Sequence, residues 1–322
     1  MRRALQAIMI SAFASPVLAE APSFQLPIDC ELGETCFIQN YVDTDPSAAH
    51  RDFTCGPLSY DGHKGTDVRL ISLADMEAGV AVLAAAAGTV TATRDGMADI
   101  ASTAPNAPDL EGRDCGNGLV IDHGDGWETQ YCHMKNGSLS VSNGEKVAAG
   151  ATLGEVGLSG RTEFPHIHMS IRRAGKVVDP FAPEPRAACG PSDDSLWADT
   201  PEYVGGGLMQ AGFASDIPEF DAIKAGLASP PTLPADAGAL VMWGFAFGTQ
   251  EGDRMRFRID GPMGWSHEQE VEFDKSQAQL FRASGRRKPP EGWASGSYKG
   301  RITLMRGDAV LGEEVLSVTI AR

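Results

Sequence analysis

Residues 163–170, EFPHIHMS, place two histidines two positions apart directly behind a proline. In a β-strand the side chains at i and i+2 point to the same face, so His166 and His168 stand together while Ile167 and Met169 face the opposite layer. The stretch therefore predicts a strand in a sheet that packs one face on a core and carries imidazoles on the other. A pair of half-exposed strand histidines without a function gives the same pattern, so the surrounding sequence has to decide between the two.

Short alternating runs broken by glycine surround this stretch. They are VAVLAAAAGTVTATRDG (80–96), GLVIDHGDGWETQYCH (118–133), SLSVSNGEKVAAGATLGEVGLSG (138–160) and HIHMSIRRAGKVVDPF (166–181). Period-two alternation between closely spaced turns predicts a compact antiparallel β domain within residues 20–189, with its core at 52–181. Residues 97–114 have no apolar rhythm and are predicted to form a long inserted loop.

After Cys189 the sequence changes character. Residues 190–238 combine a polar, glycine-ended stretch with a proline-rich one and are predicted to be a linker. Strand patterns return over 239–322 and predict a β-sandwich whose ending looks like the last hairpin of an immunoglobulin-like domain. We hypothesise a docking or regulatory module there, with Arg254, Arg256, Arg258 and the run 286–288 available to an anionic glycan or a protein partner; a solvated face is the competing interpretation.

The N-terminus and the charge limit the possible functions. The opening MRRALQAIMISAFASPVLAE has two arginines, an apolar stretch and small residues before Ala19, and this predicts a signal peptide over residues 1–19. A membrane anchor is the alternative, but the apolar run is too short to span a bilayer, and no later segment is long enough. The formal net charge of −16 becomes −18 without Arg2 and Arg3, which argues against a nucleic-acid partner. We expect an exported protein, periplasmic if the cell has two membranes.

Six cysteines, an even number, indicate disulfides in such a protein. No CxxC pair exists to favour a thiolate zinc cluster. Cys115 and Cys132 flank a hairpin that reverses around residues 124–126, which would bring them onto neighbouring strands. We also predict a small loop closed by Cys30 and Cys36, which leaves Cys55 to pair with Cys189.

Four of the seven histidines fall in suggestive places. We predict that His50 and His267 lie on the surface and that His123 is a turn residue, which leaves His63, His133, His166 and His168. In GHKGTD (62–67), His63 and Asp67 can converge on one cation. With one histidine of the HxH pair they complete the three protein ligands of a catalytic zinc. His133 and the other HxH histidine then remain to take the proton of a water and to stabilise the oxyanion.

At this point the chain resembles a known family. GHKGTD, YCHM (131–134) and HIHM (166–169), together with Val147–Gly154 and GLSG before the last motif, are similar in kind and order to the lysostaphin-type (LytM-like) zinc metallopeptidases. The resemblance covers residues 52–181. It implies a lysostaphin-like fold, one Zn²⁺ per chain held by His63, Asp67 and His168, and catalysis by His133 and His166. It also implies that the substrate is the peptide stem crosslink of bacterial peptidoglycan.

The chain also departs from that family. Phe164-Pro165 and Ser170 replace the usual glycine and glutamate around HxH, and the segments 69–80 and 97–114 are expected to line or cover the groove. Asn117 matches an asparagine of the family near the groove, and a turn asparagine is the equally good alternative.

Two other functions compete with hydrolysis. One is a latent or non-enzymatic regulator of other cell-wall hydrolases with the same fold, although every ligand and both catalytic histidines are present here. The other is a biotinyl- or lipoyl-like carrier with Lys135 as the modified residue, which would leave the four histidines unexplained.

Overall fold

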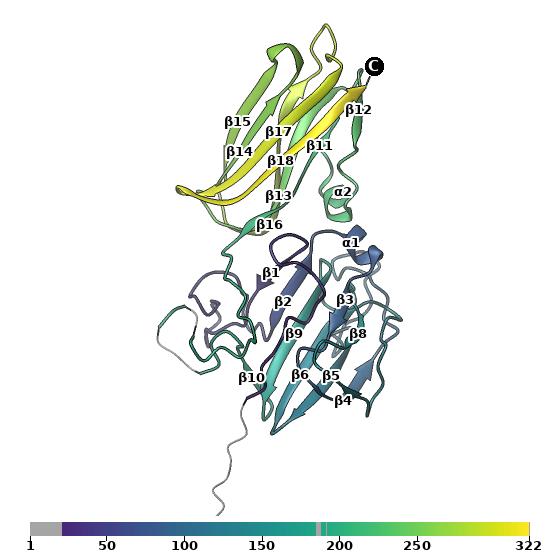
Figure 1. Cartoon of the computed structure of the whole chain (residues 1–322), viewed down its shortest axis with the longest axis vertical. Coiled ribbons are helices and arrows are strands. Elements are labelled where there is room, and N and C mark those ends of the chain that lie inside the picture. The colour runs from purple at the N-terminus through teal and green to yellow at the C-terminus, as the bar shows by residue number, and fades with distance from the viewer. Residues whose placement is uncertain (1–20, 185–187, 191, 322) are drawn as a thin grey trace, which may run out of the picture.

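The computed structural model describes residues 21–184, 188–190 and 192–321. The predicted signal peptide therefore lies outside the described residues. The predicted all-β class is confirmed, because strands dominate and the two α-helices have only six residues each. Figure 1 shows two units one above the other, an N-terminal unit built from β1 to β10 and a C-terminal unit built from β11 to β18. In the described part of the chain, no helix is both long enough and apolar enough to cross a membrane.

The N-terminal unit is built around one large sheet. The sheet follows the order β1-β2-β9-β6-β5-β4-β7, with β10 paired to β9, and β3 and β8 form a separate pair. Every pairing between the named strands of this unit, in the described part of the chain, is antiparallel. Its elements are β1 (Cys36–Asn40), β2 (Thr66–Leu70), α1 (Leu73–Ala78), β3 (Ala81–Leu83), β4 (Gly88–Arg94), β5 (Asn117–Gly124), β6 (Trp127–Met134), β7 (Lys146–Val147), β8 (Thr152–Glu155), β9 (His166–Arg173) and β10 (Lys176–Val178).

The central strand β9 alternates as predicted. Ile167, Met169 and Ile171 are at most 1% exposed and belong to the hydrophobic core. Burying three such side chains supplies roughly 1.5–3 kcal/mol each, which fixes the register of β9, since a slip by one residue would turn them all to the other face. The histidines of β9 are therefore held on the opposite face from the core.

Three disulfides join the pairs that the sequence predicted. Cys115–Cys132 links the start of the β5–β6 hairpin, which reverses at residues 124–126, and Cys30–Cys36 closes a short loop. Cys55–Cys189 spans 134 residues and ties the end of the N-terminal unit to the loop before β2. Closure of so long a loop restricts the unfolded chain strongly.

The C-terminal unit is a sandwich of two sheets. A three-stranded sheet, β11-β13-β16, faces a five-stranded one, β12-β18-β17-β14-β15, in which β12 and β18 are parallel. A second hydrophobic core fills the space between them. The elements are β11 (Gly207–Ala214), α2 (Phe220–Ala225), β12 (Thr232–Pro234), β13 (Ala239–Thr249), β14 (Arg254–Asp260), the 3-10 helix Pro262–Gly264, β15 (Ser266–Glu272), β16 (Gln277–Arg287), β17 (Gly296–Arg306) and β18 (Ala309–Ala321).

The predicted linker over 190–238 is wrong in its second half. Residues 207–214 form β11, which pairs along β13, and α2 and β12 follow it. β11 is buried on both faces: Leu208 packs in the sandwich core, while Met209 packs in the core of the N-terminal unit. A strand covered on both sides has no polar alternation, so the pattern used for prediction could not detect it.

The C-terminal arginines face outward from β14 but are not free. Arg254 and Arg256 both pair with Glu270, at 3.4 and 2.8 Å, and Arg258 pairs with Asp260 at 2.9 Å. Opposite charges on neighbouring strands neutralise this face. It therefore offers less positive charge to an anionic partner than the sequence suggested.

Packing between the units is extensive. The ring of Phe37 on β1 lies 5.3 Å from that of Phe247 on β13, and the larger core includes side chains from both units. Helices α1 and α2 meet at the same junction (Figure 1). The segment 69–80, which was expected to line or cover the groove, instead forms the end of β2 and α1 beside the C-terminal unit. That expectation is corrected: Ser72 caps α1 through Asp75, and Gly226 at the end of α2 packs on Ser72.

A buried carboxyl group directly after β10 makes stability depend on pH. Asp179 is 7% exposed; its Oδ1 accepts a hydrogen bond from the amide of Phe181, and its Oδ2 has no partner among the described residues. Burial raises the pKa of Asp179 to about 7, and the nearby carboxylate of Asp52 adds to the effect. The unfolded chain has the ordinary value near 3.9.

Between those two pH values the folded chain holds more protons than the unfolded chain, so this residue makes stability fall as pH rises. Asp179→Asn cannot ionise. From pH 5 to pH 8 we expect the free energy of unfolding of the wild type to fall by about 2 kcal/mol relative to that of Asp179→Asn. Urea titrations of both proteins at the two pH values measure this; equal pH dependences would contradict it.

Candidate metal centre

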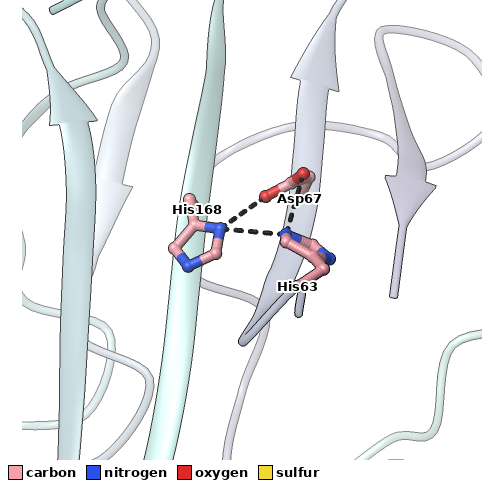
Figure 2. A group of neighbouring side chains, drawn as sticks. All are labelled: His63, Asp67 and His168. Carbon is pink, nitrogen blue, oxygen red and sulfur yellow. Dashed lines mark hydrogen bonds and ion pairs between the residues drawn. The ribbon is translucent and has the colours of Figure 1, made fainter. Parts of the chain in front are cut away.

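Three side chains converge on one point above β2 and β9. His63 Nε2 lies 3.1 Å from Asp67 Oδ2 and 3.2 Å from His168 Nδ1, and His168 Nδ1 lies 2.7 Å from Asp67 Oδ1. Figure 2 shows the three side chains pointing toward one another from two neighbouring segments. One possible ligand atom of each lies within 4.8 Å of the others.

These donors fit a zinc ion. Two imidazole nitrogens and a carboxylate oxygen are ligands that Zn²⁺ prefers, and three of them leave a fourth tetrahedral position open. Atoms bound tetrahedrally at about 2.0–2.2 Å lie roughly 3.4 Å apart, close to the observed separations. His63 and Asp67 are 3% and 2% exposed, so the pair of donors is shielded from bulk water.

The strand register explains how the three candidate ligands meet. Asp67 on β2 lies directly opposite His168 on β9, and both side chains point to the face away from the core. His63 precedes β2 in a loop whose Gly65 packs on β9. A Cβ at Gly65 would lie 2.7 Å from the His168 ring and 2.6 Å from the Met169 carbonyl oxygen. Any side chain at Gly65 would keep this loop away from β9. The glycine of GHKGTD is therefore required for the close contact between the loop and β9 as well as for the bend of the chain.

Neighbouring groups orient each candidate ligand. His63 Nδ1 donates to the carbonyl of Tyr41 at 2.6 Å, which leaves Nε2 as the free lone pair. His168 Nε2 donates to Ser170 Oγ at 3.0 Å and leaves Nδ1 for the centre. Asn40 Nδ2 donates to Asp67 Oδ2 at 3.1 Å. Such outer hydrogen bonds fix the tautomer and the ring orientation of metal ligands.

His133 and His166 stand beside the ligands with their rings 4.7 Å apart. His133 Nδ1 donates to the Ser159 carbonyl at 2.8 Å, and His166 Nδ1 donates to the Phe164 carbonyl at 3.0 Å. Both hydrogen bonds leave Nε2 as the acceptor nitrogen. His166 Nε2 lies 3.5 Å from Asp67 Oδ1, so it reaches the edge of the ligand group.

His133 also has an unusual backbone. Its φ of 64° is in the left-handed region, which non-glycine residues adopt at an energetic cost. Such strained residues concentrate at functional sites, where the surrounding structure holds them. Here the amide of His133 donates to the carbonyl of Cys115 at 2.8 Å, and Cys115 is itself joined to Cys132.

The site combines an ionised carboxylate, Asp67, with a neutral imidazole, His133. Burial opposes ionisation of Asp67, but the surrounding histidines outweigh it and hold the pKa of Asp67 well below its usual range. Burial lowers the pKa of His133 well below its ordinary value, and the neighbouring His166 and His168 lower it further. His133 is therefore neutral near pH 7 and can accept a proton.

A groove of about 300 Å³ opens over the centre. Tyr60 and Lys64 stand at one side of it, and the ring of Tyr60 lies 4.4 Å from that of His63. Arg161 and Arg172 also line it, each paired with an acid, while Lys64 has no acidic partner among the described residues. The groove adjoins a second hollow along β4 and β5, with which it shares Cys115 and Gln130.

The structure brings together the five residues that the sequence singled out, His63, Asp67, His133, His166 and His168. Asn117 is different, because it is fully buried and its side-chain amide donates to the carbonyls of Met97 and Met134. Its Oδ1 accepts from the Met97 amide, so Asn117 anchors the inserted loop and does not line the groove. The predicted role in substrate contact is corrected accordingly.

The inserted loop 97–114 reaches the groove only at its end, where Asp114 pairs with Arg161 at 2.7 Å. Two other histidine predictions have clear outcomes. His50 is exposed as predicted. His267 is not on the surface: it is 5% exposed and its Nε2 lies 2.7 Å from Ser284 Oγ. It is inward-facing on β15, so its alternation with polar neighbours was the signal that could have placed it.

Sequence comparison finds a match to a known family in the same region. Residues 61–180 match the family model described as Peptidase family M23. The chain is 37% identical over 68 residues to the cell division protein DipM of Caulobacter vibrioides, which is 21% of this chain and 11% of that protein. It is 37% identical over 67 residues to the DD-carboxypeptidase/endopeptidase Mpg of Neisseria meningitidis, which is 21% of this chain and 15% of that one.

The chain thus spans only a small part of these curated relatives. Among solved structures, it is similar to a mutant of the catalytic domain of the prophage-encoded M23 protein EnpA from Enterococcus faecalis. That match has a TM-score of 0.32 and 22% identity, and covers 50% of this chain and 94% of the other.

Proposed function

We propose that the chain, whose residues 61–180 match the model of Peptidase family M23, is an exported zinc metalloendopeptidase that hydrolyses peptide crosslinks of bacterial peptidoglycan. The observation that carries the proposal is the complete set at one point: three donors suited to zinc, with two further histidines whose Nε2 atoms are left for chemistry. Three disulfides agree with folding in an oxidising compartment such as the periplasm.

We assign the reaction steps to this chain's own residues. A zinc ion held by His63, Asp67 and His168 would polarise the scissile carbonyl and lower the pKa of a bound water. His133 Nε2 accepts the proton that the attacking water loses, because this ring is neutral and its Nδ1–H is fixed on Ser159. His166 stabilises the oxyanion by donating a hydrogen bond from Nε2, a role that requires a proton on both ring nitrogens, since Nδ1–H is held by the Phe164 carbonyl. The proton then passes to the leaving amine, which completes hydrolysis with one carboxylate and one amine as products.

The groove supports a peptide substrate. Its lining includes His133 and His168, and Tyr60, 51% exposed, lies at its edge. Lys64 is exposed beside His63 and suits a peptide that carries a carboxylate near the scissile bond. The Phe164-Pro165 and Ser170 positions differ from the usual family pattern, but Ser170 still orients His168, so the donor set is supported.

The test combines metal analysis with digestion of purified sacculi by the full chain. We expect about one zinc per chain, release of soluble muropeptides, loss of release after chelation and recovery when zinc is returned. Mass spectrometry of the products names the bond that is cut. A chain that binds zinc but releases nothing from sacculi would overturn the enzymatic proposal in favour of a regulator of other wall hydrolases.

A further inference from the structure

A buried arginine lies between the two units. Arg69, on β2 two residues after the ligand Asp67, is 1% exposed. Its guanidinium donates to side-chain oxygens of Gln39 and Gln279 and to the Leu70 carbonyl, and none of its hydrogen-bond partners among the described residues is a carboxylate. Burying a charge with only neutral partners is expensive, and an apolar side chain of similar volume would be cheaper. The arginine therefore calls for an explanation other than stability.

On one side, the Arg69 guanidinium contacts residues of the C-terminal unit. Its central carbon lies 5.4 Å from the centre of the Phe245 ring on β13, and Gln279 Oε1 on β16 accepts from Nη1 at 3.3 Å. Phe245 is fully buried and also contacts Phe220 of α2. A planar guanidinium can stack on an aromatic face and hydrogen-bond in its own plane at the same time, which a lysine ammonium cannot do.

On its other side, the guanidinium contacts Phe164, which in turn contacts His166 of the candidate active site. The guanidinium carbon lies 4.7 Å from the centre of the Phe164 ring, and that ring lies 4.7 Å from the His166 ring. The carbonyl of Phe164 accepts the hydrogen bond that fixes His166 Nδ1. Arg69 also lies opposite His166 in the β2–β9 register. Displacing Phe164 would therefore move both the packing and the hydrogen bond of His166.

We propose that Arg69 is a positioning residue that links the two units: the docked C-terminal unit holds its guanidinium against Phe164, and Phe164 holds His166 for the reaction. The C-terminal unit thereby becomes part of the catalytic apparatus without contacting substrate. This inference rests on the proposed function for its effect on turnover. The link from Phe245 to His166 is a property of the fold and can be measured without turnover.

The experiment uses two variants of the same strand in the full chain. Phe245→Leu removes the ring that faces Arg69. Phe247→Leu is the matched control, since Phe247 is equally buried at the same junction but its ring contacts Phe37 instead. The first readout is the imidazole NMR signal of His166 in the zinc-loaded protein. The second is kcat and KM on a soluble crosslinked muropeptide.

We expect Phe245→Leu to shift the His166 signal and to lower kcat about tenfold, with KM and zinc content unchanged, because positioning a catalytic group affects the transition state and not the binding of substrate. Phe247→Leu should leave both readouts at their wild-type values. Arg69→Met should shift the His166 signal in the same way, and adding Phe245→Leu to it should produce little further change, as expected for residues that act through one contact.

Two results would overturn the proposal. One is a His166 signal that stays unchanged in Phe245→Leu. The other is an equal shift in Phe247→Leu, which would indicate general loosening of the junction. A chain that cleaves no substrate would defeat the proposed function, but the His166 signal would still test the link.

Discussion

His168→Ala is expected to yield a folded chain that has lost its zinc and that cleaves sacculi no faster than the chelator-treated wild type. His168 supplies Nδ1 from the centre of the sheet, 2.7 Å from Asp67 Oδ1 and 3.2 Å from His63 Nε2. Without it only two protein donors remain, one fewer than catalytic zinc sites use. The polarised carbonyl and the activated water are lost together.

A readout independent of activity accompanies this prediction. A ligand that binds only the folded state stabilises it, by about 2.7 kcal/mol when the free ligand is at 100 times its dissociation constant. Added zinc should therefore raise the Tm of the wild type and leave that of His168→Ala unchanged.

His123→Ala is the matched control. It makes the same chemical change in the same unit, but the His123 ring bonds to Ala87 and Thr129, away from the centre. We expect it to keep zinc and activity. If His168→Ala bound one zinc per chain and cleaved at the wild-type rate, the assigned ligand set would be wrong.

Most of the centre could be predicted because its signals are local. The HxH alternation requires only the two-residue period of a strand, and GHKGTD brings its own histidine and aspartate within reach. The Cys115–Cys132 pairing likewise follows from one hairpin. What the sequence could not supply is that β2 and β9 are neighbours with Asp67 opposite His168, because that register depends on packing across the whole unit.

The supporting groups were missed for a related reason. Two of them are backbone carbonyls, those of Tyr41 and Ser159, and a carbonyl leaves no trace in residue identity. Asn40 lies 27 residues before the aspartate that it contacts. For Asn117 the sequence predicted a functional role that the structure does not support. Its side chain donates hydrogen bonds to backbone carbonyls, and a sequence cannot distinguish that use from substrate contact.

The junction between the units was beyond sequence reasoning altogether. β11 lies in a stretch predicted to be a linker. One of its faces packs in the core of the N-terminal unit and the other in the core of the sandwich. The aromatic residues of β13 look like ordinary sandwich residues, and only the folded chain shows that Phe245 and Phe247 face the N-terminal unit. Arg69, with an apolar residue on either side, carries no motif that would single it out.

The second large effect is expected from His133→Asn, which should keep zinc and lose turnover. Asparagine tolerates the left-handed backbone that His133 adopts, with φ at 64°, better than alanine does, and its amide can still donate toward the Ser159 carbonyl. The substitution therefore removes the acceptor nitrogen while sparing the backbone. Removal of a general base lowers kcat by about 10²–10⁴-fold.

The pH profile separates loss of a base from other damage. Burial and the adjacent histidines lower the pKa of His133, so in the wild type the ring stays neutral as pH falls through about 6.5, the ordinary histidine value, and protonates only at more acidic pH. Activity should accordingly persist below that pH and then fall as the ring takes up its proton. In His133→Asn the residual activity should lack this acidic limb, while zinc content, measured on the same preparation, stays at one per chain. Loss of zinc from His133→Asn would instead make His133 a ligand, and an unchanged acidic limb would assign the base to His166.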